Sequence, residues 1–80
     1  MFENDKYIIL GKTPCSGCEQ AKDELNSKGE QFMYIDITLP ENIEYLKFVK
    51  QVLGKTTVPQ IRTPSGAWIG GIDELRNFLR

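Results

Sequence analysis

The stretch KYIILGKTPCSGC, residues 6–18, joins an apolar run to the two cysteines of the chain. Its first part, residues 6–10, predicts a buried β-strand. Glycine and proline within residues 11–14 predict a loop. Beyond the loop, the pattern predicts a helix over residues 16–28, with Gly29 as its stop signal. This order of strand, loop and helix places the cysteine pair where a helix begins.

The two cysteines, Cys15 and Cys18, are separated by two residues at this helix start. Unpaired backbone N–H groups at a helix N-terminus stabilise an anion, and a thiolate is an anion. We expect Cys15 to be the more exposed nucleophile, because it precedes the helix, and Cys18 to be the more covered resolving thiol. Lys12, three residues upstream, adds positive potential that favours the thiolate. The pattern predicts a redox-active dithiol.

Composition narrows the class of protein. Residues 1–80 fit one domain, and 40% hydrophobic with 26% charged residues is typical of a soluble protein. A net charge of −1 predicts no nucleic-acid or anionic-membrane surface. The polar residues 1–5 do not match a signal peptide, and no apolar run reaches the roughly 20 residues that span a bilayer. We therefore expect a cytoplasmic protein in a reducing compartment.

That compartment bears on the cysteine pair, because cytosolic pairs are more often catalytic or metal-binding than structural. A disulfide that closes so short a loop would constrain the unfolded chain little. With two cysteines and no histidine, a four-ligand zinc site within one chain would need carboxylates. Redox catalysis is the favoured interpretation of the cysteine pair, and binding of a metal or a cluster is the second. We therefore expect no bound metal.

The rest of the chain predicts an α/β fold. A strand is expected over residues 32–37, a helix over 41–53, a hairpin over 59–69 and a last helix from Ile72. The resulting order is β-α-β-α-β-β-α. Strands joined by a helix are parallel and strands joined by a tight turn are antiparallel, so one mixed four-stranded sheet flanked by helices follows.

Two details of the helices are also predicted. In the helix over residues 41–53, which begins after Pro40 and stops at Gly54, four apolar residues recur at spacings of three and four. These residues are Ile43, Leu46, Val49 and Leu53. In the first helix, Glu24 and Lys28 are expected to form a surface ion pair one turn apart.

Two further motifs have both a structural and a functional interpretation. In Thr57-Val58-Pro59, the proline opens a strand; a cis bond before it would turn the Val58 backbone outward, toward an extended substrate. The run Gly70-Gly71-Ile72-Asp73-Glu74 can be a turn with Asp73 as helix N-cap. It can also be a receptor in which backbone N–H groups bind a carboxylate and Asp73 or Glu74 binds an amine.

Together the three motifs resemble those of the glutaredoxins, over nearly the whole chain. The match consists of Lys12-x-x-Cys15-x-x-Cys18, Thr57-Val58-Pro59 and Gly70-Gly71-x-Asp73. The resemblance implies a thioredoxin-like fold and glutathione-dependent reduction of protein disulfides and glutathione mixed disulfides. It implies a monomer with glutathione and disulfide-containing proteins as partners, and ribonucleotide reductase as one candidate acceptor of electrons.

The same resemblance implies a role for each site residue. Cys15 is the nucleophile and Cys18 the resolving thiol, Pro59 is cis, and Lys12 attracts the glycine carboxylate of glutathione. The γ-glutamyl end lies at the run from Gly71 to Asp73. The implied glutathione-binding residues are Lys12, Thr57, Val58, Pro59, Gly71, Ile72 and Asp73.

Departures from the family pattern keep two alternatives open. Ser16-Gly17 stands where many members have Pro-Tyr, and Thr56 stands where an arginine is frequent, with Lys55 as its neighbour and a substitute. Without a proline between the cysteines, the site also resembles glutaredoxins that share an iron–sulfur cluster between two protomers. A thioredoxin-like redoxin reduced by a flavoprotein reductase is the other alternative.

Overall fold

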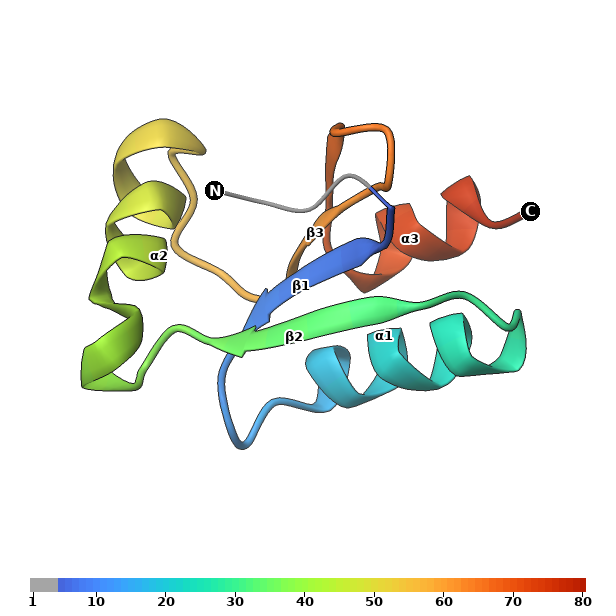
Figure 1. Cartoon of the computed structure of the whole chain (residues 1–80), viewed down its shortest axis with the longest axis horizontal. Helices are drawn as coiled ribbons and strands as arrows, with labels where there is room; N and C mark the ends of the chain where they lie inside the picture. The colour runs from blue at the N-terminus through green and yellow to red at the C-terminus, as the bar shows by residue number, and fades with distance from the viewer. Residues whose placement is uncertain (1–4) are drawn as a thin grey trace.

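The computed structural model describes residues 5–80, so most of the segment used for the signal-peptide expectation lies outside it. Within that range the predicted element order is confirmed (Figure 1). The elements are β1 (Tyr7–Gly11), α1 (Ser16–Ser27), β2 (Phe32–Asp36), the 3₁₀ turn η1 (Pro40–Asn42), α2 (Ile43–Lys47), the π-helical turn η2 (Phe48–Val52), β3 (Gln60–Arg62), β4 (Trp68–Gly70) and α3 (Ile72–Phe78).

The four strands form one mixed sheet in the order β2-β1-β3-β4. β1 pairs with β2 in parallel, with Tyr7 opposite Phe32, and with β3 antiparallel, with Leu10 opposite Gln60. β3 and β4 form the expected antiparallel hairpin. Figure 1 shows α2 on one side of this sheet and α1 and α3 on the other. The predicted α/β architecture is therefore confirmed.

The central strand β1 is buried along its whole length because both faces of the sheet are covered. Alternate β1 side chains enter two separate cores. Tyr7 and Ile9 pack under α1 and α3, with Ala21, Leu25, Ile61 and Leu75. Ile8 and Leu10 pack under α2, with Ile35, Ile37 and Val49. β1 is thus fixed from both sides, and so is the position from which the cysteine loop leaves it.

Helix α1 ends as predicted, but its surface pair differs from the prediction. Gly29 follows the helix with a φ of +69°, a conformation that suits glycine. Glu24 does not form the expected pair with Lys28. Its Oε1 instead accepts from Nε of Arg76 at 3.3 Å, and Nη2 of Arg76 donates to Oε1 of Gln20 at 2.8 Å. The ion pair differs because α3 packs alongside α1, a tertiary contact that sequence spacing does not reveal.

The helix expected over residues 41–53 is not one regular helix. It begins as η1, continues as α2 and widens into η2, where the Leu53 N–H donates to the Phe48 carbonyl five residues back, at 3.1 Å. The changes in winding rotate the apolar face, so Ile43 is 44% exposed while Phe48 packs on the core. The predicted inward position of Ile43 is therefore wrong.

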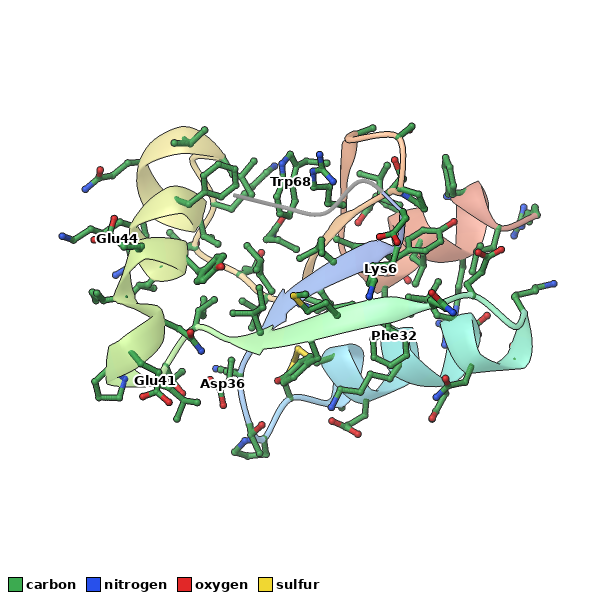
Figure 2. The ribbon with its side chains drawn as sticks, in the orientation of Figure 1. Lys6, Phe32, Asp36, Glu41, Glu44 and Trp68 are labelled. Carbon is green, nitrogen blue, oxygen red and sulfur yellow. A yellow bond between two sulfur atoms is a disulfide. The ribbon has the colours of Figure 1, made fainter. Side chains whose placement is uncertain are left out.

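The other parts of that prediction are confirmed. Val49 is buried in the core, Leu46 and Leu53 are partly buried against that core, and Gly54 ends the segment with a φ of +65°. Trp68 packs on the same core, with its ring centroid 5.2 Å from that of Phe48. In Figure 2, Trp68 lies between the upper part of the helical segment and the β3–β4 hairpin.

Asp36 ends β2, at the point where the chain turns toward α2 (Figure 2). Its Oδ1 accepts from the Thr38 hydroxyl at 2.6 Å and from the Thr38 N–H at 2.9 Å. Both hydrogen bonds favour the ionised carboxylate, and they hold the pKa of Asp36 below its usual value, with the hydroxyl as the larger cause. The turn after β2 is therefore stabilised by an ionised side chain.

Replacing Thr38 by valine should raise the pKa of Asp36, because the larger of the two causes is removed. Since the folded-state pKa is lowered, the ionised carboxylate stabilises the fold above the unfolded pKa, and this contribution is lost as the pH falls from about 4. NMR titration of the Asp36 carboxyl carbon measures the change, with Thr56→Val as the control. An unchanged titration in Thr38→Val would contradict the assignment.

Candidate active site

The cysteine pair lies at the start of α1, just beyond the carboxyl end of β1. Cys15 is the N-cap residue, with extended backbone (φ −160°, ψ 110°), and its Sγ accepts from the Cys18 N–H at 3.2 Å. The two cysteines form a disulfide, with their Cα atoms 5.3 Å apart. Cys18 is fully buried, whereas Cys15 is half-buried. The predicted difference in exposure is confirmed, and Cys15 is the sulfur that another thiol can reach.

The Val58–Pro59 peptide bond is cis, as the resemblance implied. It lies against the disulfide, because the Val58 carbonyl oxygen is 4.0 Å from Sγ of Cys15. In the disulfide Cys15 carries no S–H, so this approach is a packing contact. Pro59 itself is buried and directly precedes β3. The geometry brings a backbone segment from residue 58 beside a sulfur from residue 15.

A cavity of about 470 Å³ extends from the cis proline to the start of α3. Six of the seven residues predicted to bind glutathione line it: Thr57, Val58, Pro59, Gly71, Ile72 and Asp73. Gly17 and Lys55 line it too, so the lysine named as a substitute for the missing arginine faces this cavity. The two motifs, more than ten residues apart in sequence, form one concave surface. We call it the first cavity.

The start of α3 corrects the interpretation of Asp73 as an N-cap. The N-cap residue is Gly71, and its N–H donates to Oε1 of Glu74 at 2.7 Å. The longer glutamate side chain reaches back over the turn, as in half of a capping box. The Asp73 carboxylate is thereby left exposed in the first turn of α3, at the wall of the first cavity.

Lys12 is the one predicted ligand that does not line the first cavity. It lines a second cavity, of about 530 Å³, formed with residues 37–38 just after β2, Leu46 of α2 and the segment before Pro59. Thr57 and Val58 line both cavities, so the two adjoin across the Val58 backbone. Thr56 faces this second cavity. Lys12 and Asp73 thus line two different cavities that share Thr57 and Val58.

Three site features were not predicted. Tyr34 supports the loop before Cys15, because its hydroxyl donates to the Lys12 carbonyl at 2.8 Å and its ring packs under Lys22 Nζ, 3.8 Å from the centroid. Because both faces of the sheet are buried, the alternation of residues along the strand did not predict toward which face the Tyr34 side chain points. The Thr13–Pro14 bond is also cis, and nothing in its sequence distinguishes it from an ordinary trans proline.

Gly11 is the third missed residue, and its position is set by close packing. A Cβ atom placed on Gly11 would lie 2.7 Å from Sγ of Cys18 and 2.8 Å from Cε1 of Tyr34. Only a residue without a side chain allows both to approach the end of β1. One sequence signal could have indicated this close packing. It is a glycine at the last position of a buried strand, just before a cysteine loop.

Two features are absent from residues 5–80. No group of three or more His, Cys, Asp or Glu side chains in that range is arranged to hold a metal ion. Among the same residues, no helix is long and apolar enough to cross a membrane.

The mixed sheet, the disulfide at a helix start and the cis proline beside it define a thiol–disulfide oxidoreductase of the thioredoxin-like fold. A family model described as Glutaredoxin matches residues 8–65 of the chain. The chain is 30% identical to a glutaredoxin of Enterobacteria phage T4, over 82% of this chain and 85% of the relative. The protein therefore belongs to the glutaredoxin family.

Two other comparisons show a second kind of relative and a solved structure with the same fold. The chain is 34% identical to an N-acetyl-S-hydroxy-L-cysteine reductase of Bacillus subtilis, over 85% of this chain and 71% of that protein. The crystal structure of a buckwheat glutaredoxin–glutathione complex has the same fold, with a TM-score of 0.78 and 23% identity, over 92% of this chain and 67% of that one.

Proposed function

We propose that this protein uses glutathione to reduce protein disulfides and glutathione mixed disulfides. The observation that supports the proposal most is the first cavity, which runs from the cis Val58–Pro59 bond beside Cys15 to the start of α3. An extended peptide thiol along Val58 would pair with its backbone and direct its sulfur at Cys15. The solved buckwheat glutaredoxin is a glutathione complex, which supports this ligand.

The proposed chemistry has two branches. The Cys15 thiolate attacks a sulfur of the substrate disulfide, forms a mixed disulfide and releases one substrate thiol. For a protein disulfide, Cys18 then attacks the Cys15 sulfur and releases the second thiol, which leaves the Cys15–Cys18 disulfide. Two glutathione molecules reduce that disulfide in turn and become oxidised glutathione. For a glutathione mixed disulfide, Cys15 takes up the glutathione and a second glutathione releases it.

A coupled assay tests the choice of reductant. We expect reduction of a glutathione mixed disulfide with glutathione, glutathione reductase and NADPH to depend on the protein. The alternative redoxin would instead be reduced directly by a flavoprotein thioredoxin reductase. Turnover with that reductase and none with glutathione would overturn the proposal in favour of the alternative.

Asp73→Asn should raise the KM for glutathione with little change in kcat. The exposed Asp73 carboxylate is proposed to pair with the ammonium group of the γ-glutamyl end, and loss of one exposed charged partner corresponds to roughly a fivefold change. Steady-state kinetics over a range of glutathione concentrations measures the effect, with Asp23→Asn on the outer face of α1 as the matched control. Equal KM values for the two variants would exclude this role of Asp73.

The Bacillus relative suggests a second candidate substrate, an S-hydroxy-cysteine derivative. Cys15 thiolate would attack its sulfur and expel hydroxide, which leaves as water after protonation. Cys18 would then release the reduced cysteine derivative and form the Cys15–Cys18 disulfide. The same coupled assay with an S-hydroxy substrate decides this candidate, because protein-dependent NADPH consumption is expected if it is correct and none if it is not.

Three further assignments belong to the proposal. A cytoplasmic location would supply the glutathione, and ribonucleotide reductase is one acceptor to test with purified protein. The proposed state is a monomer without metal. Anaerobic reconstitution with iron and sulfide examines the cluster-carrier alternative, since visible absorption and a dimer on gel filtration would favour it.

A further inference from the structure

The second cavity has apolar residues in its wall, and the glycine end of glutathione that would lie there has no apolar side chain. Among the described residues, the lining of this cavity consists of Ile37, Leu46 and Val58, three threonines (Thr38, Thr56 and Thr57) and one charged residue, Lys12. Ile37 is buried, and Leu46 and Val58 are half-buried. The glycine at one end of glutathione has no side chain, and its carboxylate would interact with Lys12 and the threonines rather than with the apolar residues. Glutathione would therefore leave the apolar wall uncovered.

The position of this cavity links it to the reacting sulfur. Val58 lines both cavities, and its carbonyl oxygen lies 4.0 Å from Sγ of Cys15. A substrate chain that lies extended along Val58 advances about 3.3 Å per residue. A residue next to the substrate cysteine, or one further on, thus reaches the second cavity while the cysteine stays at Cys15.

We propose that the second cavity binds a large apolar side chain of the protein substrate, within two residues of its reactive cysteine. The inference rests on the proposed function, in that the substrate lies along Val58. The volume of about 530 Å³ admits a leucine or an aromatic side chain. Removing such a side chain from water supplies a binding energy that glutathione lacks. The cavity thus distinguishes protein substrates from the small thiol that regenerates the enzyme.

An exchange equilibrium tests this without turnover. In Cys18→Ser, Cys15 carries glutathione as a mixed disulfide, and an added peptide thiolate attacks the Cys15 sulfur, forms the peptide mixed disulfide and releases glutathione. The exchange involves no net oxidation. Its equilibrium constant therefore measures the affinity of the site for the peptide relative to glutathione. The peptides are Ala-Ala-Cys-Ala-Ala and two forms with leucine directly before or directly after the cysteine. Mass spectrometry of the intact protein gives the ratio of the two adducts.

We expect at least one leucine peptide to be favoured about tenfold over the alanine peptide, as burial of most of a leucine side chain implies. Leu46→Gln should remove most of this preference. Ile43→Gln is the matched control, because Ile43 lies on the same helix but is exposed outside the cavity. Should Leu46→Gln fold poorly by circular dichroism, the exposed Thr56→Asp places a charge in the same wall.

The outcomes separate this inference from the function on which it rests. Equal exchange constants for the leucine and alanine peptides would overturn the proposed apolar site and leave the proposed function intact. A preference unchanged in Leu46→Gln and Thr56→Asp would likewise overturn it. Failure of Cys15 to form a mixed disulfide with glutathione or any peptide would overturn both.

Discussion

Cys15→Ser should reduce disulfide turnover to the rate of glutathione alone, the largest effect expected for any substitution in this chain. Cys15 is the half-buried sulfur beside Val58, whereas Cys18 is fully buried. A serine hydroxyl at this position is not ionised near neutral pH and cannot form the mixed disulfide. The coupled glutathione reductase assay measures the loss, with a Ser16→Ala variant as the neighbouring control.

Cys18→Ser separates the two proposed roles. We expect this variant to retain reduction of glutathione mixed disulfides, which needs one thiol, and to lose reduction of a protein disulfide, which needs the resolving thiol. Both substrates should be measured at equal protein concentration. Parallel loss of both activities in Cys15→Ser and Cys18→Ser would show that the assignment of nucleophile and resolving thiol is wrong.

Gly11→Ala should lower the free energy of unfolding by about 2 kcal/mol, since overpacking of a buried position has costs of this order. The new Cβ would lie 2.7 Å from Sγ of Cys18, which the disulfide and the first turn of α1 hold in place. For a domain of this size the midpoint of thermal unfolding should fall by roughly 10 °C. Calorimetry of the oxidised protein measures both quantities.

A second substitution tests the stated cause of that loss. In a Cys18→Ala background the sulfur is absent, so Gly11→Ala should cost less there, with a coupling of at least about 0.5 kcal/mol between the two positions. Both backgrounds should be compared in the reduced state, which removes the disulfide from the comparison. An equal cost in both would show that the Cys18 sulfur is not what excludes a side chain at Gly11.

The architecture was predictable because its signals are local. Apolar runs, helix stops such as Gly29 and Gly54, and the short turn of the hairpin gave the element order without any tertiary information. The cysteine pair was equally local, since its place at a helix start follows from the loop and helix on either side. The position of Pro59 beside Cys15 and the gathering of six predicted ligands in one cavity came from the family resemblance.

The sequence-based predictions failed where the deciding contact is distant in sequence or geometrically subtle. Glu24 pairs with Arg76, 52 residues away in sequence, instead of with Lys28. Rules on helical spacing do not include a contact between two different helices. The widened turn η2 alters which apolar side chains face the sheet, so Ile43 is exposed. Asp73 is a common N-cap type, but the backbone places Gly71 there instead, and Glu74 is within reach of its N–H.

The hydrogen bond from Gly71 N–H to Glu74 has a consequence for selectivity among small acids. A simple carboxylate that approached this amide would have to displace Glu74, exchanging one charge-assisted hydrogen bond for another of similar strength. Such a ligand would gain little and leave Glu74 without a partner. A zwitterion would bring an ammonium group that the released carboxylate and Asp73 could share. Under the proposed function, Glu74 would therefore compete with simple anions for this amide and favour amino acid head groups.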